Sequence, residues 1–176
     1  MPQKLGALPV VLALATGSFA IGTTEFATMS LLPFIQAELD IDPSTASHLI
    51  SAYALGVVFG APIITVLAAK MARKPLLLIL MSLFALGNAL SAVAPGYGSL
   101  MLCRFLAGIP HGAYFGVASL VAASVVDPAR RTQAVGYVML GLTIATVIGV
   151  PLATWLGNAA GWRSGYWVIA AIAVTA

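Results

Sequence analysis

Long uninterrupted apolar runs dominate the chain, and short polar connectors separate them. An α-helix rises about 1.5 Å per residue, so about 20 mostly apolar residues are needed to cross the hydrocarbon core of a bilayer. Five runs reach that length, and the sixth stops after 12 residues; the expected spans are 7–33, 46–69, 75–94, 99–126, 132–157 and 165–176. The pattern predicts an all-α membrane protein with five full transmembrane helices and a truncated sixth. A sixth span of that length indicates a fragment of a larger fold.

The composition agrees with a protein whose solvent is lipid. Hydrophobic residues make up 61% of the chain and charged residues only 7%, whereas a soluble domain carries about 25% charged residues. The net charge of +3 is spread thinly, and no stretch combines dense basic residues with aromatics. The sequence therefore predicts no nucleic-acid partner.

The charged residues of the connectors divide unequally between the two sides of the membrane. Alternate connectors share a side, and the side of the N-terminus receives Lys4, Lys70, Arg73, Lys74, Arg130 and Arg131. The other side receives Arg163 beside an acidic cluster of Glu38, Asp40 and Asp42. Lysine and arginine in short loops mark the cytoplasmic face. The sequence thus predicts a multi-pass protein of the cell (inner) membrane with a cytoplasmic N-terminus.

Small residues recur at every fourth position in several spans, which places them on one ridge of each helix. Helices in lipid associate through close van der Waals contact, which small residues permit. The residues expected to pack helices together are Gly108, Gly112 and Gly116 in the fourth span, and Gly141, Gly149 and Pro151 in the fifth. Pro151 also removes a backbone donor and can kink its helix. These spans are expected to form a tight multi-helix bundle.

Three titratable side chains fall inside the predicted spans: Glu25 in the first span, and Arg104 and His111 in the fourth. A charge in the bilayer core costs several kcal/mol unless it faces a cavity or a partner. Counted from the outer ends of their spans, Glu25 and Arg104 lie about 12 Å and about 8 Å deep. We expect these two to approach each other, directly or through water, in at least one state. An ion pair that only fixes helix register stays open, as does a packing role for His111.

Three stretches resemble a known family. Residues 65–74 read Thr-Val-Leu-Ala-Ala-Lys-Met-Ala-Arg-Lys, similar to Gly-x-Leu-Ala-Asp-Arg-x-Gly-Arg-Lys/Arg, with Ala69 in the place of the Asp. Residues 100–108 place Arg104 four positions before Gly108. Gly149-Val-Pro151 loosely resembles a Gly-Pro antiporter motif. These stretches resemble the major facilitator superfamily in its drug/proton-antiporter branch, closest to arabinose-efflux-permease-like exporters.

The resemblance implies the N-terminal half of a superfamily fold, in which two inverted three-helix repeats place the first and fourth spans beside a central cavity. It implies proton transfer at Arg104 alone. Glu25 and His111 are expected proton-coupling or cavity residues on their own chemistry, because a carboxylate and an imidazole inside the membrane can carry protons. The resemblance assigns Lys70, Arg73 and Lys74 to a cytoplasmic gate or to orientation.

The predicted function is therefore proton-coupled secondary transport, with efflux of a sugar-like or drug-like small molecule. The implied partners are that substrate, protons, the lipid bilayer and a missing C-terminal half, with no cofactor and no metal. A non-transporting truncated bundle, a facilitator and an importer remain alternatives. An intramembrane enzyme is disfavoured because the sequence has no His-Glu-x-x-His and no Gly-x-Ser-x-Gly motif.

Overall fold

The computed structural model describes residues 6–176, and this range folds as α-helices joined by short connectors. The helices are α1 (Ala7–Leu39), α2 (Pro43–Leu67), α3 (Arg73–Ala92), α4 (Tyr97–Ser124), α5 (Arg131–Ile144), α6 (Val150–Ala160) and α7 (Trp162–Thr175). Five continuous helical rods in this range are long and apolar enough to cross a membrane. The predicted all-α membrane fold is confirmed. Lys4, which entered the charge comparison, lies outside the described residues.

The fifth rod, Pro128–Ala160, is built from four segments, of which the first is a short 3-10 helix, Pro128–Arg130. Between α5 and α6 the chain forms one π-helical stretch, Ala145–Gly149. Pro151, the second residue of α6, offers no N–H to the helix ladder, and helices commonly kink at prolines and at π turns. Pro151 itself is exposed, and the packing role expected of it stays a prediction. Here it marks a local change of helix winding.

Most helices begin two or three residues before the expected spans, and α1 continues through Pro33 to Leu39. The expected limits followed hydropathy, but a helix continues past its apolar part until a capping residue ends it. At the start of α2, the Asp42 carboxylate accepts hydrogen bonds from the backbone N–H groups of Ser44 (2.9 Å) and Thr45 (3.1 Å). This is an N-cap on a polar segment that hydropathy does not detect.

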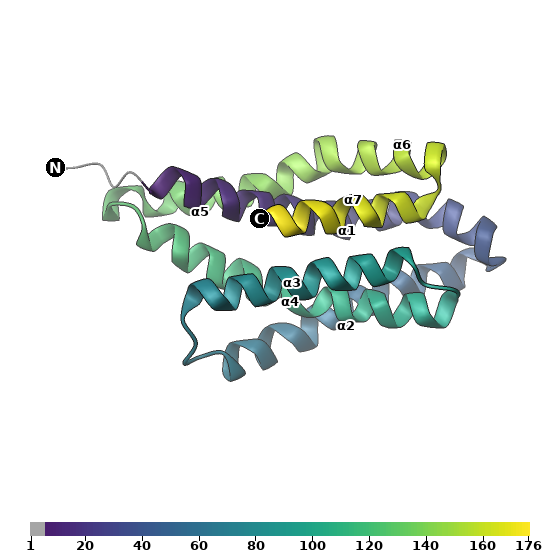
Figure 1. Cartoon of the computed structure of the whole chain (residues 1–176), viewed down its shortest axis with the longest axis horizontal. Coiled ribbons are helices and arrows are strands. Elements are labelled where there is room, and N and C mark those ends of the chain that lie inside the picture. The colour runs from purple at the N-terminus through teal and green to yellow at the C-terminus, as the bar shows by residue number, and fades with distance from the viewer. Residues whose placement is uncertain (1–5) are drawn as a thin grey trace.

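The connectors gather at two ends of an elongated bundle (Figure 1). The α2–α3 and α4–α5 connectors lie at the end where α1 begins, and the other connectors lie at the opposite end. At that opposite end, Arg163 forms an ion pair with Glu38 and donates a hydrogen bond to the carbonyl of Ala94 (2.9 Å). One side chain at the start of α7 therefore joins the end of α1 and the α3–α4 connector. The alternation of connectors between two sides, which the charge comparison assumed, matches the fold.

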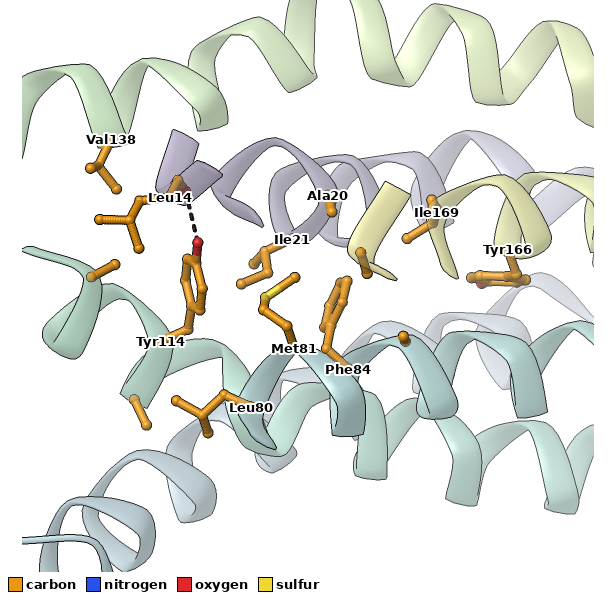
Figure 2. Packing of buried hydrophobic residues seen from close by; sticks show 14 of the residues in the cluster. Leu14, Ala20, Ile21, Leu80, Met81, Phe84, Tyr114, Val138, Tyr166 and Ile169 are labelled. Carbon is orange, nitrogen blue, oxygen red and sulfur yellow. Dashed lines mark hydrogen bonds between the residues drawn. The ribbon is translucent and has the colours of Figure 1, made fainter. Parts of the chain in front are cut away.

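Helices α1 and α4 are the central members of two packed groups. Helix α1 packs against α5, α6 and α7, while α4 packs against α2 and α3. Between the groups lies a layer of buried side chains that includes Ile21, Met81 and Phe84 (Figure 2). Across it, the hydroxyl of Tyr114 on α4 donates to the carbonyl of Leu14 on α1 over 2.8 Å. The first and fourth spans are thus tied directly to each other.

Glycine allows the closest helix contacts, especially where α2 crosses α4. A Cβ atom on Gly108 would overlap the backbone carbonyl of Tyr53, and one on Gly56 would overlap that of Phe105. Similar overlaps occur at other expected packing glycines: Gly112 against Ala61, Gly141 against Ala15 and Gly149 against Thr23.

Gly116 is the exception among these glycines. It is exposed, and no described atom lies within 4 Å of its Cβ position. The packing contact expected of Gly116 is therefore not made within the described residues of this bundle.

Candidate functional site

A cavity of about 260 Å³ opens between α1, α2 and α4, within the membrane-spanning part of the bundle. Its polar lining includes Glu25 from α1, Tyr53 from α2, and Arg104 and His111 from α4. Apolar residues complete the wall, namely Met29, Ile50, Ala54, Val57 and Val58. All three titratable residues singled out in the sequence therefore border one space. The cavity combines an acidic, a basic and an imidazole group with a surface suited to an apolar solute.

Arg104 is fully buried and is stabilised by neutral groups. Its Nη1 donates to Asn88 Oδ1 (3.4 Å) and its Nη2 to the carbonyl of Thr24 (3.5 Å). Its guanidinium carbon lies 4.6 Å from the ring centroid of Tyr53 and 5.1 Å from that of Tyr166. Cation–π attraction strengthens when the groups are removed from water, so two tyrosine rings offset part of the cost of burying this charge.

Glu25 and Arg104 do not form an ion pair in this structure. Among residues 6–176, the one ion pair with nitrogen and oxygen within 4.0 Å of each other is Arg163 with Glu38. Glu25 is half-buried on the cavity wall, next in sequence to Thr24, whose carbonyl Arg104 contacts. The expected approach of the carboxylate and the guanidinium, directly or through water, therefore stays a prediction for another state.

His111 belongs to an aromatic group deeper along α4. Its Nδ1 lies 2.9 Å from the hydroxyl of Tyr53, and its ring centroid is 5.7 Å from the Tyr53 ring and 5.2 Å from the Phe115 ring. Tyr53 thus touches both His111 and Arg104. A change of charge on either group would be felt by the other through this one ring.

Sequence reasoning missed the polar residues that surround Arg104. Thr24 Oγ1 donates to Asn88 Oδ1 over 2.5 Å, and the hydroxyls of Thr28 and Tyr166 lie 3.2 Å apart. All four residues are buried. Asn88 carried a readable signal, because it is the one amide in the third span, where the other polar side chains are serines. Polar side chains in such spans pair with one another or with backbone groups.

The basic connector lies away from the cavity. Arg73, the first residue of α3, donates from Nη1 to the carbonyl of Leu120 near the end of α4 (3.4 Å). Lysine and arginine near a helix C-terminus interact favourably with its exposed carbonyls. Lys70 and Lys74 are exposed beside it. The structure brings Arg73 against α4, at the end opposite to the Arg163–Glu38 ion pair.

Residues 14–176 match the Major Facilitator Superfamily. The chain belongs to this superfamily. It is 51% identical over 164 residues to the inner membrane transport protein YdhP of Escherichia coli, which covers 93% of this chain and 42% of YdhP. It is 36% identical to a chloramphenicol resistance protein of Streptomyces lividans, and the match covers 93% of this chain and 41% of that protein. It is 33% identical to a probable sugar efflux transporter of Helicobacter pylori, and that match covers 95% of this chain and 43% of the transporter. The chain spans about two fifths of the length of these superfamily members.

A solved superfamily-like structure shows the same fold. The bacterial homologue of the human lysosomal transporter Spinster, in an inward-facing and unoccupied conformation, superposes with a TM-score of 0.80 at 16% identity. The match covers 98% of this chain and 42% of that one. The superfamily assignment from motifs is confirmed, and the chain is an integral membrane protein of a transporter family. Its relatives are named as transporters, which agrees with the prediction that it is not an enzyme.

Proposed function

We propose that this chain is the N-terminal half of a proton-coupled exporter of a sugar-like or drug-like small molecule. The observation that carries the proposal is the cavity between α1, α2 and α4, where Glu25 is half-buried without a cation within 4.0 Å among the described residues. A carboxyl group in such a place can exchange a proton with an aqueous passage. Two relatives support the solute class through their names, chloramphenicol resistance protein and probable sugar efflux transporter.

In the proposed mechanism, substrate and proton favour different protonation states of Glu25. The bundle rocks against the second half and exposes the cavity to alternate sides. Arg104 and His111 form the charged and polar surroundings of this exchange and communicate through Tyr53. The basic residues Lys70, Arg73 and Lys74 orient the chain, and Arg73 holds the cytoplasmic end of α3 to α4.

The proposal predicts that Glu25→Gln abolishes gradient-driven transport by the intact protein. The amide keeps the size of the side chain but cannot exchange a proton. Reconstituted vesicles with an imposed proton gradient are tested with radiolabelled chloramphenicol and radiolabelled glucose, and flux should fall at least about tenfold, as removal of an essential proton carrier does. Asp40→Asn is the matched control, because Asp40 is exposed outside the spans and asparagine tolerates its left-handed backbone (φ 50°).

The control should transport like the wild type. Equal gradient-driven flux in wild type and Glu25→Gln would remove Glu25 from the mechanism. Flux that follows the solute gradient alone would instead identify a facilitator. Solute that moves together with protons, in the direction in which the protons flow, would identify an importer.

The proposed orientation places the N-terminus in the cytoplasm of a cell whose inner membrane holds the protein. Its support is the asymmetry of basic residues between the two ends of the bundle. With Cys103 replaced by serine and no other reactive thiol present, Ser44→Cys should react with a membrane-impermeant maleimide added to intact cells. Lys70→Cys should react only after the cells are opened. Both positions are exposed at opposite ends of the bundle, and the reverse labelling pattern would invert the topology.

A further inference from the structure

Asn88 is a fully buried amide on α3 and does not line the cavity. An amide removed from water costs several kcal/mol unless hydrogen bonds replace its hydration, and lipid supplies none. Asn88 makes three such bonds within the bundle. Its Nδ2 donates to the carbonyl of Phe84 (2.9 Å), while Oδ1 accepts from Thr24 Oγ1 (2.5 Å) and from Arg104 Nη1 (3.4 Å). One side chain of α3 thus joins α1 to α4.

The chemistry of the partners fixes the orientation of this amide. A guanidinium has five N–H donors and no acceptor, so the Asn88 oxygen must face Arg104. With the amide turned over, two sets of N–H groups would oppose each other, and the acceptor of the Thr24 hydroxyl would be lost. The contact is therefore specific for a residue with an oxygen at this position.

Asn88 and Arg104 hold the same residue of α1 at two points. Asn88 accepts from the Thr24 hydroxyl, and Arg104 donates to the Thr24 carbonyl. Neighbouring residues of a helix point about 100° apart around its axis. When Thr24 is held toward the interior of the bundle, the next side chain, Glu25, is turned to the cavity wall. The position of Glu25 therefore depends on the contacts of its neighbour.

We propose that Asn88 is a positioning residue of the transport site, which holds Arg104 against Thr24 and so sets where Glu25 meets the cavity. The effect of Asn88 on transport rests on the proposed function. The effect of Asn88 on the position of Arg104 does not. Asn88 acts through other residues and touches neither the cavity nor a solute there. Its loss should disturb the coupling of transport to protons more than the exchange of solute.

The first experiment measures Arg104 directly in the intact protein. Guanidinium ¹⁵N signals are recorded by NMR, and those of Arg104 are identified by their absence in Arg104→Lys. Asn88→Ser should shift or broaden them, because serine is too short to reach Arg104. Serine can still bond the carbonyl one turn earlier, as Ser91 Oγ does with Gly87 (2.8 Å), so this variant should fold.

Two further variants control this measurement. Ser91→Ala removes a different buried polar group from the same helix and should leave the Arg104 signals unchanged. Asn88→Asp keeps two acceptor oxygens and should retain ordered Arg104 signals. Wild-type signals in Asn88→Ser would overturn the proposal, and so would an equal disturbance in Ser91→Ala.

The second experiment separates coupling from general damage. For whichever of chloramphenicol and glucose the wild type carries, Asn88→Ser should reduce gradient-driven flux about tenfold. This is less than the roughly hundredfold loss that a fully misplaced group can cause, because Arg104 keeps its contact with the Thr24 carbonyl. Exchange of labelled for unlabelled solute without a gradient should be retained. An equal loss of both rates would indicate a structural role and would contradict the inference. If the wild type carries neither probe against its gradient, the proposed function fails and the Arg104 signals alone decide the positioning role.

Discussion

Gly108→Ala is expected to destabilise the helix bundle by about 2–3 kcal/mol, the upper part of the range for overpacking a tight interior. The added methyl group would overlap the backbone carbonyl of Tyr53 on α2. Backbone cannot move aside as a flexible side chain can, so α2 and α4 must separate. The expected result is a lower midpoint in thermal unfolding of the purified protein, followed by the loss of monodisperse material.

Gly116→Ala is the matched control for this prediction, because it makes the same change on the same helix. No described atom lies within 4 Å of its Cβ position. In an open helical position alanine is favoured over glycine by about 1 kcal/mol, so this variant should be equally or more stable than the wild type. The two variants should thus differ in sign. Equal midpoints for both would show that α2 and α4 do not rely on the contact at Gly108.

The Gly108 contact also links packing to the candidate site. Gly108 lies between Arg104 and His111 along α4, and the residue that packs on it, Tyr53, contacts both of their side chains. A displacement of α2 at Gly108 would therefore move the tyrosine ring away from both groups. For this reason Gly108→Ala should lower the transport rate even in the fraction that remains folded.

The sequence was sufficient for the fold and for three titratable residues that border the cavity. Long apolar runs can satisfy their backbone groups in lipid only as helices or closed barrels, so continuous runs predict the spans directly. Glu25, Arg104 and His111 stood out because charged and titratable groups are rare in such spans. Burying such a group in lipid costs several kcal/mol, which makes these residues rare in spans and also favours placing them together at one polar cavity.

The partners of these residues were harder to predict from the sequence. Opposite charge at similar depth suggested Glu25 for Arg104, yet two tyrosine rings, an amide and a backbone carbonyl surround Arg104. Depth along a helix can be counted from the sequence, but the rotation of one helix against another depends on packing. Gly116 shows the same limit, because its spacing matches Gly108 and Gly112 while its surroundings do not.

Among substitutions in this chain that conserve charge, Arg104→Lys should reduce transport the most. Lysine keeps the positive charge but has a single nitrogen on a flexible stem, so it lacks the planar fork of arginine. It cannot reach Asn88 Oδ1 and the Thr24 carbonyl while its charge also faces both tyrosine rings. We expect gradient-driven flux to fall about a hundredfold, the loss typical of a displaced reacting group, measured in the same vesicles as the Glu25 variant.

Arg163→Lys provides the matched control, because Arg163 also joins several elements, through Glu38 and the carbonyl of Ala94. Its contacts are partly exposed at the end of the bundle, where an ion pair contributes about 1 kcal/mol or less. This variant should therefore transport nearly as well as the wild type. A hundredfold loss in Arg104→Lys beside normal flux in Arg163→Lys would locate the requirement for a guanidinium in the membrane. Normal flux in both would mean that positive charge alone suffices at Arg104, and the contacts to Thr24 and Asn88 would lose their role in coupling.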